Sequence, residues 1–554
     1  MSVPTPARSG GRLLVDALIG RGCDLAFGVP GESYLAVLDA LYDTQDKLRF
    51  ITCRHEGGAA FMAEAYAKLT GRPGICFVTR GPGATNASIG VHTARQDSTP
   101  LILFVGQVGR DFADREAFQE IDFRRMFGQM AKWIASIDRA ERVPEYVNKA
   151  FQIAQSGRPG PVVLALPEDM LASEAAVPDV PPQPLARPAP REEDAQRLQG
   201  LLAQSARPLL LLGGSGWTPA ARADAARFAD AFGLPVATGF RRQDLFDNRH
   251  DAYAGYVGLG MDPKLAQRVR EADLLIVAGS RLGEMVTLGY ELFGGSTARR
   301  ALVHAHADPQ ELGTLFDTTL AINAGMPELA RMLARLPARP GPWRQWTQSA
   351  RQDYLASLEP PPAPEVPLQV DMAAIVHWLN LRLRGEVVVT NGAGNYAGWA
   401  HRYFQHGPQR RQLGPTSGAM GYSVPSAVAA KLAHPDRVVV SFAGDGCYMM
   451  NGQELATAVQ YDAPIIVIVV NNGVYGTIRM HQRREYPGRP SGTALRNPDF
   501  ARLAEAYGGH GETVLRTADF APAFERALAS GKPAVIDVRT EPRAITTRLI
   551  EAQN

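Results

Sequence analysis

Short apolar runs alternate with amphipathic stretches along most of this chain. In the first third, runs of strand length lie at 24–29, 49–53, 74–79 and 101–105. Before and between them, patterns with a helical period lie at 12–21, 34–42 and 57–69. The middle third repeats the alternation, with apolar runs at 208–212, 235–238, 273–278 and 302–305. Continuous apolar strands between helices are typical of parallel sheets that are covered on both faces. The pattern therefore predicts an α/β fold.

Two proline-rich stretches divide the chain into three pieces. They cover 177–190 and 337–367. We expect both stretches to be extended and to lie on the surface, because proline cannot donate a hydrogen bond within a sheet. The pieces that remain are predicted to be three doubly wound domains with mostly parallel sheets, at 1–176, 190–336 and 368–554.

The composition narrows the class of protein. A length of 554 residues corresponds to about three or four domains of ~150 residues. The net charge of +2 gives no electrostatic footprint for nucleic acid or for a membrane surface, and no apolar run approaches the ~20 residues of a membrane span. The N-terminus lacks the apolar region of a signal peptide. The four cysteines lack the spacing of a structural zinc site, which favours a reducing cytoplasm: Cys23, Cys53, Cys76 and Cys447.

A candidate metal site lies in the last third of the chain. Its parts, in order, are a strand at 438–442, Gly444-Asp445-Gly446, a helix at 452–461, a strand at 464–470 and Asn471-Asn472. The carboxyl ends of adjacent parallel strands meet at one rim, where open α/β sheets bind ligands. A carboxylate, an amide oxygen and backbone carbonyls are the ligands that Mg²⁺ prefers, and phosphate oxygens complete its octahedron. The alternative is a glycine turn and a polar strand end in an ordinary nucleotide-binding fold.

A second candidate site lies in the first third. Glu56 follows the strand at 49–53 and opens the next helix, whose N-terminus would favour the anionic carboxylate while burial would oppose it. The glycine-rich segment 79–86 follows the next strand, and its glycines allow backbone to approach a ligand closely. By itself, however, a glutamate in the first turn is usually a favourable contact with the helix dipole and nothing more.

The two sites together resemble the thiamine-diphosphate-dependent acetolactate synthase family, large-subunit type. Gly-Asp-Gly followed after 24 residues by Asn-Asn is similar to the thiamine-diphosphate fingerprint. The resemblance covers nearly the whole chain, and the stretches that carry it are Phe27-Gly28-Val29-Pro30-Gly31, Arg54-His55-Glu56, Gly81-Pro82-Gly83-Ala84-Thr85-Asn86, Ala117-Phe118-Gln119-Glu120, Gly418-Ala419-Met420-Gly421 and Gln453-Glu454-Leu455-Ala456-Thr457. It implies an N-terminal pyrimidine-binding, a central and a C-terminal diphosphate-binding domain.

The resemblance also assigns roles. Asp445 and Asn472 would ligate Mg²⁺ by their side chains and Val474 by its carbonyl. Glu56 would bond the pyrimidine N1′ of the cofactor and relay a proton, and Gln119 would be a second catalytic residue. The residues expected around the cofactor are Pro30, Gly31, Glu56, Asn86, Asn395, Tyr396, Gly418, Met420, Gly444, Asp445, Gly446, Cys447, Asn472, Val474, Tyr475 and Gly476. Because the two halves of the cofactor site meet across a subunit interface in this family, the resemblance implies an obligate homodimer or a dimer of dimers.

The expected reaction is decarboxylation of a 2-keto acid and transfer of the acyl-anion equivalent to an acceptor. The alternatives are a 2-keto-acid decarboxylase, another C–C lyase or carboligase, and a non-catalytic cofactor-binding subunit. Residues expected on the substrate side are Gly31, Glu32, Arg80, Phe118, Ile478 and His481. Three positions depart from the family: Met285 replaces an arginine tied to the acceptor keto acid, His481 replaces a tryptophan, and Arg80 replaces a serine. Arg80 would bind an anionic substrate or form a structural salt bridge, and His481 would bind the acceptor or face solvent.

The sequence of the middle piece does not decide whether this domain binds FAD. Gly213-Gly214-Ser215-Gly216 follows a strand, as in the synthases that hold a non-redox FAD. Two matching motifs are altered, to Gly260-Met261-Asp262-Pro263 and His306-Ala307-Asp308. Some relatives keep this domain without flavin. The sequence names neither the donor nor the acceptor, and it does not say whether a regulatory small subunit binds.

Overall fold

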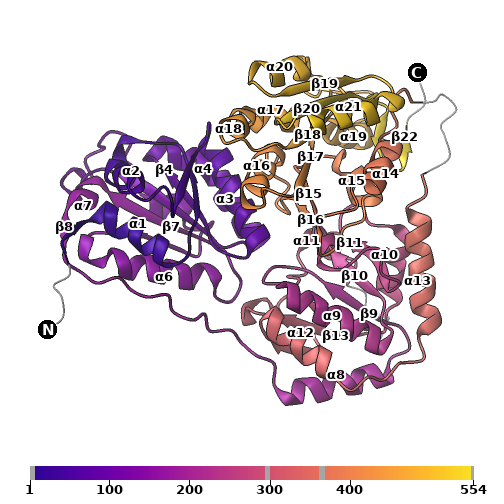
Figure 1. The fold of residues 1–554 in the computed structure, drawn as a ribbon. Coiled ribbons are helices and arrows are strands. Elements are labelled where there is room, and N and C mark those ends of the chain that lie inside the picture. Colours follow the sequence, from indigo (N-terminus) through magenta and orange to yellow (C-terminus); the bar gives the residue numbers. More distant parts are fainter. Residues whose placement is uncertain (1–5, 294–299, 361–367, 551–554) are drawn as a thin grey trace. The chain divides into compact units, whose positions relative to one another are not determined.

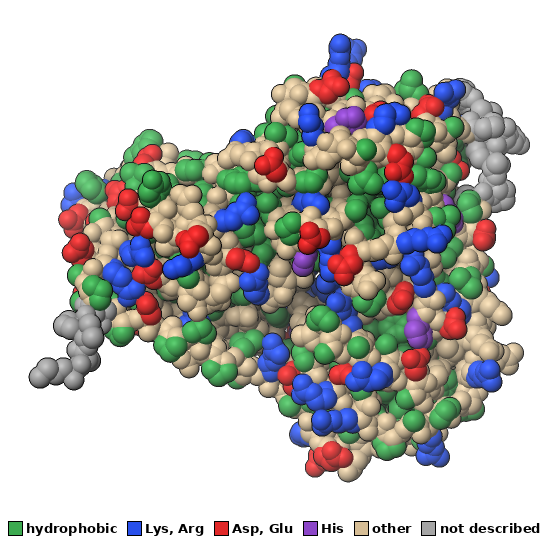
Figure 2. All heavy atoms as spheres, in the orientation of Figure 1, with side chains coloured by type: hydrophobic (Ala, Val, Ile, Leu, Met, Phe, Trp, Pro, Cys, Tyr) green, Lys and Arg blue, Asp and Glu red, His purple; other side chains and the backbone are tan. Residues whose placement is uncertain are grey.

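Three six-stranded parallel sheets organise the chain (Figure 1). The computed structural model describes residues 6–293, 300–360 and 368–550. The chain forms two compact units, of which the first comprises 1–186, 424–435 and 449–463 and the second comprises 187–423, 436–448 and 464–554. No helix in the described ranges is both long and apolar enough to cross a membrane. On the face that Figure 2 shows, basic and acidic side chains are interspersed, in keeping with the small net charge.

The first unit contains a sheet of order β3-β2-β4-β5-β7-β6. The strands are β2 Leu25–Gly28, β3 Arg49–Thr52, β4 Gly74–Val78, β5 Leu101–Gln107, β6 Trp133–Ser136 and β7 Pro161–Pro167. The helices are α1 Gly10–Gly20, α2 Leu35–Tyr42, α3 Glu56–Thr70, α4 Gly81–Asp97, α5 Phe123–Phe127, α6 Val143–Gln155 and α7 Glu168–Ala172. A short antiparallel pair joins β1 Arg8–Ser9 to β8 Glu174–Ala175. Helices α3 and α4 approach closely because Gly90 has no side chain, since a Cβ there would lie 2.3 Å from the Cβ of Ala60.

The second unit contains the two remaining sheets. The first has the order β11-β10-β9-β12-β13-β14, so the strand order reverses between β9 and β12. Its strands are β9 Pro208–Leu212, β10 Val236–Gly239, β11 Tyr253–Val257, β12 Leu274–Ala278, β13 Ala301–His306 and β14 Leu320–Asn323. Its helices are α8 Glu192–Gln204, α9 Pro219–Phe232, α10 Pro263–Glu271, α11 Glu284–Thr287, α12 Met326–Arg335 and α13 Arg344–Ser357.

The other sheet of this unit has the order β16-β15-β17-β18-β20-β19. Its strands are β15 Val387–Asn391, β16 Arg410–Leu413, β17 Val438–Gly444, β18 Ile466–Asn471, β19 His510–Val514 and β20 Ala534–Arg539. The helices of this part of the chain are α14 Met372–Arg382, α15 Ala397–Tyr403, α16 Ser423–Ala433, α17 Asp445–Asn451, α18 Leu455–Gln460, α19 Gly476–Glu485, α20 Phe500–Ala506 and α21 Thr517–Ala529. The hairpin β21 Ala544–Thr546 and β22 Leu549–Ile550 follows.

The predicted α/β class with doubly wound parallel sheets is confirmed. Two local predictions were wrong. Part of the second proline-rich stretch is helix α13, which contains no proline and buries Ala350 and Tyr354. The helix expected at 452–461 begins earlier, at Asp445, and a 3-10 turn at Gly452–Glu454 separates α17 from α18. The prolines at 361–367 lie outside the described residues, and the domain boundaries remain predictions.

Candidate active site

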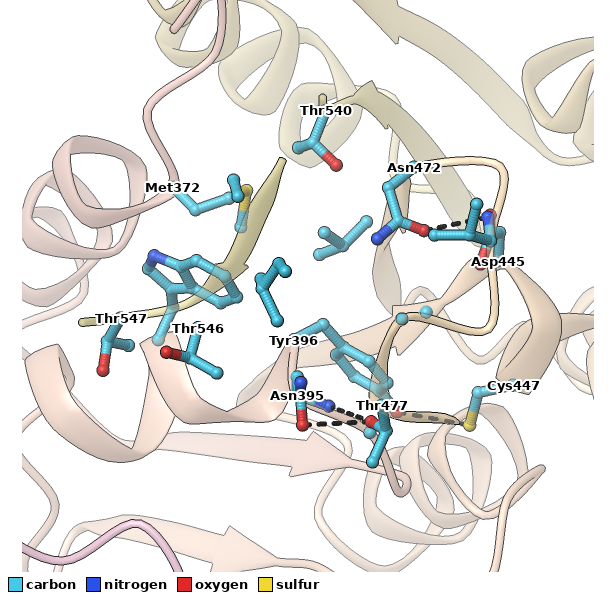
Figure 3. A pocket seen from close by; sticks show the side chains of 18 of the residues that line it. Met372, Asn395, Tyr396, Asp445, Cys447, Asn472, Thr477, Thr540, Thr546 and Thr547 are labelled. Atoms are coloured by element: carbon cyan, nitrogen blue, oxygen red, sulfur yellow. Dashed lines mark hydrogen bonds between the residues drawn. The ribbon is translucent and has the colours of Figure 1, made fainter. Parts of the chain in front are cut away.

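The predicted metal ligands meet at the rim where β17 and β18 end. The two strands are parallel neighbours, and Gly444 pairs with Val470 at their carboxyl ends. Asp445 and Asn472 follow directly and line a cavity of about 550 Å³, together with Val474. In the view of Figure 3, Asp445 and Asn472 lie on one side of this cavity, and Met372 lies on the other.

Asp445 is held by three hydrogen-bond donors. Its Oδ1 accepts the N–H of Gly446 at 2.8 Å, and its Oδ2 accepts the N–H of Gly473 and the side-chain amide of Asn497, each at 2.8 Å. Burial raises the pKa of Asp445, and these hydrogen bonds oppose the rise. Asn497 also donates to the side-chain oxygen of Asn471 at 2.9 Å. The carboxylate is therefore fixed in one orientation at the rim.

Asn472 offers the amide oxygen that the predicted magnesium site would use. Its Oδ1 accepts the N–H of Val474 at 3.2 Å, which folds the loop after β18 back toward the strand end (Figure 3). A carboxylate, an amide oxygen and a nearby backbone carbonyl are the oxygen donors that Mg²⁺ takes when phosphate supplies the rest. The residues present therefore fit a magnesium-bound diphosphate.

The glycines of Gly444-Asp445-Gly446 leave room for aromatic rings. A Cβ on Gly444 would lie 2.8 Å from the ring of Tyr396, and a Cβ on Gly446 would lie 2.4 Å from the ring of Tyr475. Real Cβ atoms do not approach other atoms so closely. Both rings therefore rest directly against the backbone of the rim, and both tyrosines line the cavity.

Asn395 and Tyr396 form the next part of the cavity wall. The Tyr396 hydroxyl donates to the sulfur of Cys447 at 3.2 Å, and burial holds the pKa of Tyr396 well above its ordinary value. The N–H of Asn395 donates to the Thr477 hydroxyl at 2.9 Å, and that hydroxyl lies 3.0 Å from the Asn395 side-chain oxygen. Thr477 thus fixes Asn395, as Figure 3 shows.

Gly418 and Met420 complete the set of predicted cofactor residues in this unit. Both line the cavity, and Gly418 has a φ of +73°, which a side chain would strain. Ile478 lines the same cavity and is 53% exposed. His481 is exposed, and its ring nitrogen lies 3.2 Å from the guanidinium of Arg484.

The first unit brings Glu56 and Asn86 together. Glu56 is the first residue of α3, and its Oε2 accepts the side-chain amide of Asn86 on α4 at 2.9 Å. Pro30 and Gly31 follow β2, and Gly31 packs so closely on Thr79 that a Cβ would lie 2.5 Å from the Thr79 side chain. The side-chain amide of Asn86 thus orients one carboxylate oxygen of Glu56.

Arg80 forms ion pairs with two carboxylates. Its guanidinium lies 2.5 Å from Glu168 and 3.6 Å from Glu32, and the Arg80 side chain is only 9% exposed. Nearby, Gln119 adopts a φ of +66°, and its carbonyl accepts the N–H of Gly81 at 2.9 Å. Its side-chain oxygen is buried and has no hydrogen-bond partner among the described residues. The neighbouring Phe118 is 72% exposed.

The glycines of the middle sheet that matched a flavin site pack against each other. A Cβ on Gly214 would lie 1.8 Å from the carbonyl oxygen of Gly279, and one on Gly213 would lie 2.9 Å from Ser280. The indole of Trp217 donates to the Gly213 carbonyl at 2.8 Å. These contacts join the loops after β9 and β12, so packing within the protein accounts for Gly213 and Gly214.

Several residues of the site carried no sequence signal. Asn497 and Thr477 are single polar residues far from the motif they support. The apolar side of the cavity comes from elements that the motif does not contain: Leu368, Val370, Met372, Trp399, Tyr403, Ile545 and Ile550. The spacing of Gly444-Asp445-Gly446 from Asn472 predicted the rim. The apolar wall opposite the rim is seen only in the folded structure.

Comparison with known proteins assigns this arrangement to a class. Three family models match: "Thiamine pyrophosphate enzyme, N-terminal TPP binding domain" at 8–126, "Thiamine pyrophosphate enzyme, central domain" at 195–333 and "Thiamine pyrophosphate enzyme, C-terminal TPP binding domain" at 392–538. The rim at Asp445 lies in the last of these. The chain is therefore an enzyme of the thiamine-diphosphate-dependent class, as the sequence predicts.

Full-length relatives narrow the class to a family. The acetolactate synthase large subunit of Corynebacterium glutamicum is 32% identical over 548 residues, which cover 96% of this chain and 86% of that protein. The acetolactate synthase isozyme 2 large subunit of Escherichia coli K12 is 32% identical over 534 residues, covering 96% and 95%. The acetolactate synthase of Arthrospira platensis is 32% identical over 551 residues, covering 96% and 94%. The chain belongs to the acetolactate synthase family.

Proposed function

We propose that this enzyme decarboxylates a 2-keto acid and transfers the acyl-anion equivalent to an acceptor. The observation that carries the proposal is the cavity at the β17–β18 rim, where Asp445, Asn472 and Val474 meet Tyr396 and Met420. Bound thiamine diphosphate supplies an electron sink that lets carbon dioxide leave the keto acid. The chain's own residues bind the diphosphate through Mg²⁺, orient the ring system and exclude water.

Within that site, Asp445 and Asn472 would hold Mg²⁺ by their side chains and Val474 by its carbonyl. The backbone at Gly446 and Cys447 would face the diphosphate. Gly418 and Met420, which line the same cavity, would support the ring system. The fixed orientation of the Asp445 carboxylate supports this assignment.

Glu56 would hold and move the proton that activates the ring. Asn86 binds its Oε2 at 2.9 Å, which leaves Oε1 to carry a proton toward a ring nitrogen. Positioned proton transfer of this kind contributes about 10²–10⁴-fold to a rate. By resemblance to the family, Glu56 would serve the cofactor held by a second subunit, so we propose a homodimer or a dimer of dimers.

The acceptor is the less defined part of the reaction. Met285 stands where a synthase arginine is tied to the acceptor keto acid, and a thioether cannot form the bidentate pair that a guanidinium forms with a carboxylate. This supports an acceptor other than a second 2-keto acid, within a carboligase or lyase reaction. The proposed substrate-side residues remain Gly31, Glu32, Arg80, Phe118, Ile478 and His481. Gln119 remains a proposed catalytic residue.

Incubation with thiamine diphosphate, Mg²⁺ and a panel of 2-keto acids tests the reaction. Mass detection of carbon dioxide and of the organic product should show turnover of at least one keto acid. Asp445→Ala should abolish Mg²⁺-dependent cofactor binding, and Glu56→Gln should keep binding while losing turnover. Full turnover by Glu56→Gln would refute the proton role. The visible spectrum of the purified protein tests for FAD, and light scattering after gel filtration tests the dimer.

A further inference from the structure

A buried glutamate outside the predicted site contacts the backbone next to Glu56. Glu454 ends the 3-10 turn between α17 and α18, and its side chain is fully buried within the first unit. Its Oε1 accepts the N–H of His55 at 2.9 Å and that of Arg54 at 3.0 Å. Its Oε2 accepts the hydroxyl of Thr457 at 2.6 Å. A carboxylate with two backbone donors is a strong, directional anchor.

A second contact from the same segment reinforces this anchor. The Tyr461 hydroxyl accepts the N–H of Thr52 at 2.8 Å and lies 3.3 Å from the carbonyl oxygen of Phe50. Tyr461 therefore holds two backbone groups of β3, and Glu454 holds two backbone groups of the turn from β3 into α3. We call this arrangement the turn clamp.

The fit of the clamp is close on the helix side. Gly58 is the third residue of α3, and a Cβ there would lie 2.6 Å from Oε1 of Glu454. The carboxylate thus occupies the space that any other residue at this position would fill. The groups that face it are the thiol of buried Cys53, the backbone of His55, and Arg54, whose guanidinium binds Gln460 at 2.6 Å.

The clamped turn carries the proposed catalytic carboxylate. His55, whose N–H Glu454 accepts, is the N-cap of α3, and Glu56 is the first residue of the helix. The first residues of a helix have N–H groups without partners inside the helix, so their direction depends on such external acceptors. A shift of the turn would move Glu56 and its contact with Asn86 together.

We propose that Glu454 is a positioning residue for catalysis, and that its carboxylate holds the β3–α3 turn so that Glu56 points at the ring nitrogen of the cofactor. The proposal rests on the proposed role of Glu56. It predicts that loss of the anchor lowers the rate of proton transfer while the diphosphate site, which belongs to other residues, keeps its affinity.

The variants Glu454→Ala and Glu454→Gln test the proposal, with Glu512→Gln as a matched control. Glu512 is a carboxylate on β19, in the second unit, where it pairs with Arg526 at 2.8 Å. We expect Glu454→Ala to lower kcat by roughly tenfold or more, a part of the ~10²–10⁴ that positioned proton transfer supplies. Its Kd for thiamine diphosphate with Mg²⁺ should stay within about twofold, and the control should match the wild type.

Two readouts separate positioning from a general loss of structure. In the protein without cofactor, the amides of Arg54 and His55 should exchange hydrogen faster in Glu454→Ala, and amides of β18 should not. The acid limb of the kcat–pH profile should move in the isosteric Glu454→Gln, because a neutral amide no longer titrates. If Glu454→Ala does not fold, the profile and exchange of Glu454→Gln decide the question.

The outcomes distinguish the two proposals. Unchanged kcat, exchange and pH profile in the Glu454 variants would overturn the positioning role, provided that Glu56→Gln is inactive. Full activity of Glu56→Gln would overturn the proposed proton role itself. A parallel loss of cofactor affinity and kcat in Glu454→Ala would also overturn the positioning role, since it would show general damage to the site.

Discussion

The titration of Glu454 should make the free energy of unfolding of the protein without cofactor depend on pH. Burial raises the pKa of Glu454 from 4.5 to about 7. Because the folded-state pKa lies above the unfolded value, the folded state binds the proton more tightly between these pH values. Stability from this group is therefore complete below about pH 4.5 and is lost as the pH rises through 7.

The magnitude follows from the size of the shift. A difference of about 2.5 pKa units corresponds to roughly 3 kcal/mol at about 1.4 kcal/mol per unit. Glutamine at this position does not titrate, so the wild type should lose about 3 kcal/mol relative to Glu454→Gln between pH 4.5 and 7. Hydrogen bonds from Thr457 and from the backbone of Arg54 and His55 oppose the rise, and the pKa of about 7 is the net result.

Urea unfolding of the apoprotein, followed by tryptophan fluorescence at several pH values, measures this difference. The control Glu512→Gln should behave in the opposite way. Hydrogen bonding to Arg526 lowers the pKa of Glu512, so its stabilisation is present above the unfolded pKa and is lost as the pH falls. Wild-type and Glu454→Gln curves that stay parallel across this range would refute the buried, titrating carboxylate.

Three further predictions concern packing and the rim. Gly58→Ala places a methyl group 2.6 Å from a Glu454 oxygen, so it should lower kcat and cost about 1–3 kcal/mol of stability by overpacking; kinetics and urea midpoints measure both, and a wild-type midpoint would contradict the close fit. Gly446→Ala places a methyl group 2.4 Å from the Tyr475 ring, and we expect the Kd for thiamine diphosphate, measured by calorimetry, to rise at least tenfold, or about 1.4 kcal/mol. Asn497→Ala removes two amide hydrogen bonds at the rim and should weaken Mg²⁺-dependent cofactor binding by about 1–3 kcal/mol; unchanged affinity would show that the rim does not need this support.

The sequence predicted the parts of the fold that depend on local pattern. The strand at 74–79 and the run at 464–470 are continuous apolar segments, and both appear as buried strands, β4 and β18. Helix α13 was missed because prolines on both sides of it dominated the composition of the stretch. The helix begins only after those prolines, and burial of Tyr354 fixes it.

The site residues, too, fall into those that a local sequence pattern predicts and those that only the fold brings together. Spacing alone predicted that Asp445 and Asn472 would share a rim, because strand order and direction follow from the repeated pattern. The support from Asn497 arises 52 residues beyond Asp445 in the chain, and no local pattern encodes such a contact. Glu454 lies in one of the stretches that resemble the family, but the sequence assigned it no role, and only the fold shows that it is fully buried. The sequence left two roles open for Arg80, and the structure shows its ion pairs with Glu168 and Glu32.

The three donors around Asp445 bear on the thermodynamics of cofactor capture. A flexible carboxylate loses rotamer entropy when a metal fixes it, and that loss subtracts from affinity. Here the Gly446, Gly473 and Asn497 donors already restrict the side chain. The Asp445 side chain is therefore ordered when the protein folds, and metal binding does not have to restrict it again. Such preorganisation should appear as a small entropic penalty of Mg²⁺-diphosphate binding.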